Sequence, residues 1–96
     1  MHVATLTLDV LLGDVHSLKQ KRSLVRPLVA DLRRLDVAVA ETGHLDLHRR
    51  AEVSCAVVAA DAGHCRAVLD RAEQLAASRP ELELLSARVR FYGDDA

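Results

Sequence analysis

The segment His2–Leu12, which reads HVATLTLDVLL, alternates between apolar and polar side chains along most of its length. In an extended chain one face carries the apolar side chains of Ala4, Leu6, Leu8, Val10 and Leu12. The opposite face carries two threonines and Asp9. A period of two with β-branched residues is typical of a strand that is buried on one side only. This segment therefore predicts a half-buried strand that needs partners on its flanks.

Three further segments have strand character. Ala51–Ala60 repeats the alternation, and Asp36–Thr42 is a short run rich in valine and alanine. Leu82–Phe91 changes parity midway, and a one-residue bulge near Leu84 would turn all its apolar residues toward the core. These residues are Leu82, Leu84, Leu85, Ala87, Val89 and Phe91.

Two helices are predicted between the strands. Ser17 is a candidate N-cap for the first helix, whose apolar residues Val25, Leu28, Val29 and Leu32 recur at helical spacing. Pro27 interrupts this pattern, so either the helix bends there or Leu18–Arg22 is a separate turn and the regular helix starts near Ser23. Asp61 caps the second helix, which carries one apolar stripe and ends before Pro80.

The order strand, helix, strand, strand, helix, strand predicts an α+β fold, the ferredoxin-like βαββαβ sandwich. Its four-stranded antiparallel sheet would be covered by both helices on one face. We expect one domain over residues 1–92 and a flexible tail over 93–96. The predicted core consists of Leu6, Leu8, Val10, Leu28, Leu32, Val53, Cys55, Val57, Leu69, Ala72 and Leu75.

The composition excludes several functions of this fold. The chain has 96 residues and a net charge of −1, which argues against a generally polybasic nucleic-acid binder. It has one Tyr, one Phe and no Trp, and its first and third strands lack the aromatics of RNA-recognition motifs. Acylphosphatases resemble this topology but use an asparagine, which this chain lacks. We expect a cytoplasmic protein without membrane contact, because Val3–Leu12 is too short to span a bilayer.

Basic residues gather in one segment. Asp14–Arg34 holds six cations against two carboxylates. At helical spacing some of them share one face, and the helix N-terminus adds free N–H groups that suit a phosphate. The interpretations are a nucleic-acid or anion-binding surface, or a solvated polar face. The predicted contact residues are Lys19, Lys21, Arg22, Arg26 and Arg50, with Arg33, Arg34 and Arg49 widening the patch.

A second polar group lies between the second and third strands. Glu41, His44 and Asp46 form a possible polar site, to which His48 could add a ligand. The spacing lacks the definite Cys and His pattern of zinc sites, so we expect a hydrogen-bonded turn and no metal. No nucleophile or cofactor motif accompanies it, so the sequence predicts no catalytic residue and no cofactor, and leans away from an enzyme.

Several motifs occur together in a fixed order. They are SLKQKR at 17–22, VAVAE at 37–41, HLDL at 44–47, Arg50-Ala51 and PELELL at 80–85. With these motifs the chain resembles the YlxP-like family of small bacterial proteins of unknown function, from about Met1 to Phe91. The family pattern has Glu where Gln20 stands here. The resemblance implies a ferredoxin-like fold and genes beside those for translation initiation and ribosome maturation factors. It carries no catalytic residues over.

Two functional hypotheses follow. The first is a non-catalytic accessory factor that contacts phosphates of ribosomal RNA or of ribosome assembly intermediates through the basic patch. The alternative is a small-anion or metabolite-binding dimeric domain without nucleic acid. A short apolar edge strand around Val37–Ala40 favours a homodimer in either case, because unprotected edges tend to pair.

Overall fold

The structure is a computed structural model that describes residues 1–93. Its elements are β1 (His2–Leu12), α1 (Leu18–Arg33), β2 (Ala38–Gly43), β3 (Arg50–Ala59), α2 (Ala62–Ala77) and β4 (Leu82–Gly93). This order confirms the predicted βαββαβ arrangement. The predicted strand and helix segments agree with these bounds to within a few residues.

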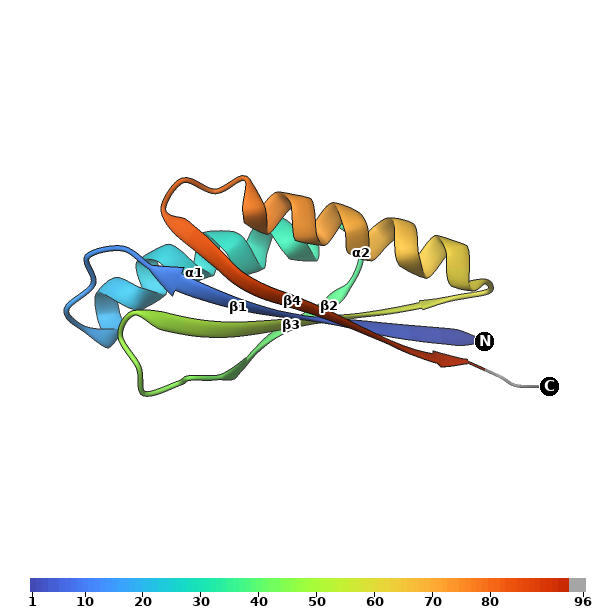
Figure 1. The fold of residues 1–96 in the computed structure, drawn as a ribbon, viewed down its shortest axis with the longest axis horizontal. Helices are drawn as coiled ribbons and strands as arrows, with labels where there is room; N and C mark the ends of the chain where they lie inside the picture. The colour runs from blue at the N-terminus through green and yellow to red at the C-terminus, as the bar shows by residue number, and fades with distance from the viewer. Residues whose placement is uncertain (94–96) are drawn as a thin grey trace.

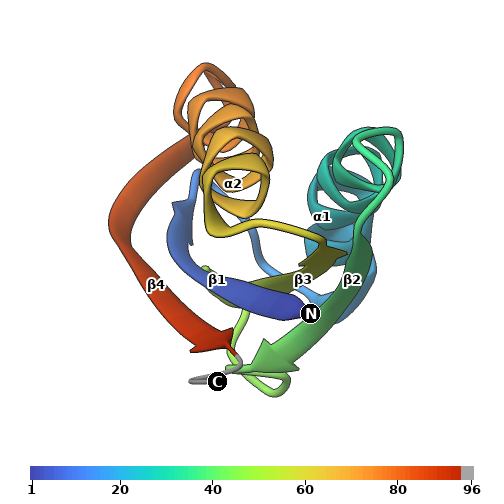
Figure 2. The same cartoon turned by 90° about the vertical axis from the view of Figure 1, so that its right-hand side faces the viewer.

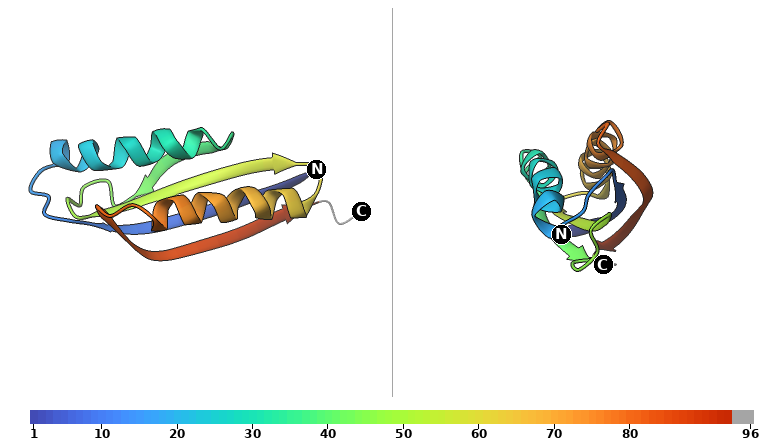
Figure 3. Two further views of the ribbon diagram at one scale, coloured as in Figure 1. Left: turned by 90° about the horizontal axis from the view of Figure 1, so that it is seen from above. Right: turned by 90° about the vertical axis from the view of Figure 1, so that its left-hand side faces the viewer.

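The strands form one antiparallel sheet in the order β2-β3-β1-β4. Both helices cover the same face of this sheet, as Figure 1 shows from the side and Figure 2 from one end. From above, the helices run lengthwise along the strands (Figure 3). α2 packs on β1, β3 and β4, whereas α1 packs mainly on β2. The fold is therefore the predicted ferredoxin-like α+β fold, with β2 and β4 as its edges.

The core lies between the sheet and the helices. Leu8 faces Val53 across β1 and β3, and Ala4 faces Val57, so the alternating residues of both strands point to the same side. Their exposed fractions are 6% or less. All the predicted core residues are buried except Leu75, which packs against the core while partly exposed.

Helix α1 begins at Leu18 and continues through Pro27 without interruption. The Ser17 hydroxyl accepts a hydrogen bond from the Gln20 N–H at 3.1 Å, which confirms the predicted N-cap. Of the two alternatives for the helix start, the continuous helix is correct. The proline removes one helical N–H donor, so the Ser23 carbonyl lacks its usual helical partner.

The end of β4 differs from the prediction in detail. Asp9 faces Ser86 while Val10 faces Leu84, so Leu85 is the extra residue of the predicted bulge. Leu85 is 43% exposed, and its assignment to the core was wrong because the bulged residue has no partner on β1. Phe91 faces Ala4 but is 42% exposed, with the Arg66 guanidinium 4.8 Å from its ring centroid. The predicted tail began at Gly93, which belongs to β4, and residues 94–96 lie outside the described part.

Across residues 1–93, neither helix has the length and apolar character needed to cross a membrane.

Candidate functional site

The exposed cations of α1 form one line along the helix. Lys19, Arg22, Arg26 and Arg33 are separated by three, four and seven residues, which places them on one helical face. All four are exposed, and none forms a salt bridge with another residue of the described 1–93 range. We call these four residues the basic stripe. Their charges are free to meet an external anion.

A groove runs beside the basic stripe, between α1 and the edge strand β2. Its volume is about 510 Å³. It is lined by Arg22, Val25, Arg26, Val29, Ala30 and Arg33 from α1 and by Ala40 and Glu41 from β2. The groove thus combines an apolar floor with three of the four stripe cations. The sequence analysis found the arginines but not the groove, because β2 joins α1 only in the tertiary structure.

Lys21 does not share the position of the stripe. Its side chain is only 4% exposed, and its Nζ lies 2.9 Å from Oε2 of Glu41 and donates to the His44 carbonyl at 2.7 Å. The lysine therefore ties α1 to β2 and to the turn after β2. The reason is helical periodicity, since residues 21, 25, 28 and 32 share the buried face of α1. That spacing was present in the sequence, but a lysine is rarely assigned to a core position.

Arg50 lies on the opposite, open face of the sheet. It donates two hydrogen bonds to Asp9, at 3.1 and 2.6 Å. These bonds hold the pKa of Asp9 below its ordinary value, with smaller contributions from nearby charges that include His44, and partial burial opposes the shift. Arg50 is therefore neutralised in place, and the predicted contact residues do not form one surface.

The predicted polar site does not converge either. The Glu41 carboxylate pairs with Lys21, whereas Nε2 of His44 lies 3.6 Å from the Asp9 carboxylate on the open face. His44 adopts a left-handed backbone conformation, with φ of 55°, so the chain turns sharply here. Asp46 lies exposed in the loop that follows. In residues 1–93 no three His, Cys, Asp or Glu side chains gather closely enough to hold a metal ion.

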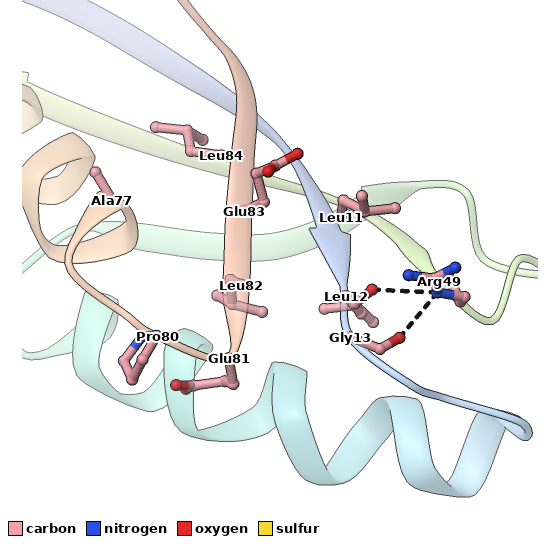
Figure 4. A pocket seen from close by; sticks show the side chains of 10 residues that line it. All are labelled: Leu11, Leu12, Gly13, Arg49, Ala77, Pro80, Glu81, Leu82, Glu83 and Leu84. Carbon is pink, nitrogen blue, oxygen red and sulfur yellow. Dashed lines mark hydrogen bonds between the residues drawn. The ribbon is translucent and has the colours of Figure 1, made fainter.

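Arg34 and Arg49 were predicted to widen the patch, and both have internal partners. Arg34 lies 3.6 Å from Asp31. Nε of Arg49 donates to the carbonyls of Leu12 and Gly13, at 3.3 and 2.9 Å (Figure 4). The cavity drawn there, of about 630 Å³, also holds the carboxylates of Glu81 and Glu83. Glu81 is paired with Arg79 at 3.0 Å, and Glu83 offsets the charge of Arg49, so the cavity offers an anion no excess positive charge.

Both cysteines are free and buried. Burial raises the pKa of the Cys55 thiol to about 11, which keeps it protonated at neutral pH. A thiol in this state is a weak nucleophile, in agreement with the predicted place of Cys55 in the core.

Comparison with known proteins gives a family and a fold. A family model described as "Protein of unknown function (DUF503)" matches residues 3–89. No curated protein matches the chain. Among solved structures, the chain is similar to the de novo designed protein Foldit4, with a TM-score of 0.58 and 12% identity. The match covers 98% of this chain and 99% of the designed one, and at that identity it shows the fold alone.

Proposed function

The chain belongs to the DUF503 family of proteins of unknown function, and we propose that it is a non-catalytic factor that binds RNA through the phosphates. The basic stripe on α1 makes the contacts. Ribosomal RNA and ribosome assembly intermediates are the partners that the resemblance to YlxP-like proteins suggests. Self-association through the β2 edge stays a prediction.

The observation that carries the proposal is the contrast between neutralised and free cations on α1. On α1 Lys21 has a carboxylate partner, whereas the four stripe residues have none within residues 1–93. Arg34, just after the helix, and Arg50 on β3 have carboxylate partners as well. The chain as a whole has a net charge of −1. Charges that serve solubility alone need not share one helical face, whereas these four cations do. Such a line is the electrostatic footprint of nucleic-acid binding.

The position of the stripe adds to this argument. Lys19 and Arg22 lie near the N-terminus of α1, whose first turn contains no acidic residue. A cation in this first turn, such as Lys19, opposes the helix dipole at a cost of a few tenths of a kcal/mol or more. A bound phosphate relieves this conflict, because it interacts favourably with both the side chains and the helix terminus.

Binding of this kind is weakly specific and strongly dependent on salt. Each phosphate neutralised on a single strand contributes roughly −0.7 to the slope of log affinity against log salt concentration. Four contacts from the stripe therefore give a slope of about −3.

The test is fluorescence anisotropy with a labelled fragment of ribosomal RNA over a range of salt. The double variant Arg22→Ala/Arg26→Ala should bind more weakly, with a slope shallower by about 1.4. The matched control is Arg71→Ala/Arg88→Ala, which removes two exposed cations from α2 and β4. Absence of RNA binding by the native protein at low salt, or an equal loss in the control, overturns the proposal.

The alternative, a small-anion or metabolite-binding dimeric domain, draws support from the groove, where three arginines surround a space of about 510 Å³. Inorganic phosphate distinguishes the two. If the stripe binds RNA, phosphate displaces the RNA only at concentrations that raise the general ionic strength. If the groove is a small-anion site, phosphate occupies it at concentrations that leave the ionic strength almost unchanged.

A further inference from the structure

We propose that the groove between α1 and β2 seats a single strand of RNA and excludes a duplex. This inference rests on the proposed function and adds the form of RNA that is bound. The phosphates meet Arg22, Arg26 and Arg33, and the unpaired bases and riboses lie on the apolar floor of Val25, Val29 and Ala30.

The cations follow the length of the groove. Arg22 and Arg33 are eleven residues apart on one helix, which corresponds to ~16 Å along its axis. Arg26 lies between them, so the positive charge is distributed along the groove and does not converge on one point. A charge distributed in this way is complementary to a phosphodiester chain, which carries one charge per nucleotide.

The apolar floor favours a single strand. Bases in a duplex are stacked and paired in its interior, and the major groove of double-stranded RNA is too narrow for side chains to reach them. A duplex would therefore leave Val29 and Ala30 uncovered and meet only the tips of the arginines. A single strand can turn its bases toward the floor. No aromatic residue lines the groove, so the bases contact the apolar floor while the guanidinium groups stay with the phosphates.

The groove stays positive because its one acid is compensated. Glu41 lines the groove, and its carboxylate pairs with the buried Lys21 at 2.9 Å. Without this ion pair the Glu41 carboxylate would repel the phosphates of the RNA. Lys21 thus acts as a positioning residue that supports the groove from behind, with no contact to the ligand.

An acidic peptide added as a strand beside β2 is the competing occupant, because β2 is an edge of the sheet. The residues that line the groove argue against such a peptide. All lining residues except Ala40 and Glu41 come from α1, so the groove follows the helix and touches only the middle of β2. A paired strand would run along the whole of Ala38–Gly43, where it meets few of these side chains.

The test compares labelled oligouridylate alone with the same strand annealed to oligoadenylate, at fixed salt. We expect the single strand to bind roughly tenfold more tightly, a difference comparable to burying about two CH2 groups of the floor. Backbone amide signals of Val25, Val29 and Ala30 should shift in nuclear magnetic resonance spectra when the single strand is added. Equal affinity for the duplex, or shifts confined to other surfaces, overturns the inference.

A variant that fills the groove without changing charge gives the second arm. Ala30→Leu places a branched side chain on the floor, and Ala67→Leu is the matched control at an exposed alanine of α2. The first should weaken oligouridylate binding severalfold and the second should not. If polyglutamate binds the native protein and Ala30→Leu abolishes that binding while RNA binding is unchanged, the groove takes a peptide and the inference is wrong.

The two proposals fail in different ways. If the protein binds single-stranded and double-stranded RNA equally and both need Arg22 and Arg26, the proposed function holds and the groove inference is wrong. If neither binds at low salt, both fall.

Discussion

Replacing Lys21 by methionine tests whether this lysine supports the fold or touches the ligand. The substitution keeps most of the side chain's length and removes its charge. Lys21 is 3% exposed as a residue, and it holds the Glu41 carboxylate and the His44 carbonyl. If Lys21 supports the fold, Lys21→Met should lower the stability of the protein. If Lys21 contacts phosphate, the substitution should lower RNA affinity alone.

The magnitude follows from the burial of the two partners. The Glu41 side chain is 27% exposed, so water can hydrate its carboxylate after Lys21 is removed. A hydrogen bond to a charged group contributes roughly 1.5–3 kcal/mol, and we expect Lys21→Met to cost about 2 kcal/mol. Glu41→Gln should cost more, about 3 kcal/mol, because it leaves an ammonium that is almost fully buried without a counter-charge. The double variant, which buries no charge, should be more stable than Glu41→Gln alone.

The assay is urea unfolding followed by circular dichroism, since the chain has no Trp. In thermal unfolding monitored by the same signal, a loss of 2 kcal/mol corresponds to a fall in Tm of roughly 8–16 °C in a domain of this size. RNA affinity should fall in Lys21→Met, where Glu41 is left uncompensated, and return in the double variant. If Lys21→Met unfolds like the native protein and its weaker RNA binding is not rescued by Glu41→Gln, Lys21 contacts phosphate and the supporting role assigned to it is wrong.

Four further outcomes are expected. Leu69→Ala should cost ~2–5 kcal/mol in urea unfolding, because Leu69 is 1% exposed in the core; a cost below 1 kcal/mol would contradict its placement. The Arg50 hydrogen bonds hold the pKa of Asp9 below 3.8, so this pairing stabilises the fold above that pH and is lost as the pH falls below it. Urea midpoints measured between neutral pH and pH 2.5 should therefore fall less steeply in Arg50→Gln than in the native protein, and parallel curves would refute the pairing. Cys55, with its pKa raised to about 11, and the equally buried Cys65 should react with Ellman's reagent at pH 8 only after denaturant is added; rapid labelling of the folded protein would show an accessible thiol. Pro27→Ala should raise stability by about 1–2 kcal/mol, because it returns an N–H donor to the helix interior, and an unchanged urea midpoint would mean that the hydrogen bond missing at Pro27 has no cost.

The fold could be predicted from the sequence because its signals are local. The alternation over His2–Leu12 and Ala51–Ala60 depends only on the two-residue period of a strand, and the caps at Ser17 and Asp61 depend on atoms three residues away. These short-range preferences agree with one another along the chain, and together they specify the βαββαβ order. The bulge in the last strand was also predictable from its change of parity. Which residue would be left unpaired was not, because that depends on the register of Leu84 and Ser86 against β1.

The candidate site was predictable only in part. The basic residues and their helical spacing are written in the sequence, and so is the position of residue 21 on the buried face of α1. What makes a buried lysine tolerable is Glu41, twenty residues further along, and that pairing exists only once β2 lies beside α1. The same packing creates the groove, since neither element has a concave surface alone. Local periodicity therefore determined which elements form and which faces they bury. Contacts between distant segments decided which of the cations are neutralised and which stay free, because the Coulomb energy of a pair depends on its distance in space and on the water excluded around it.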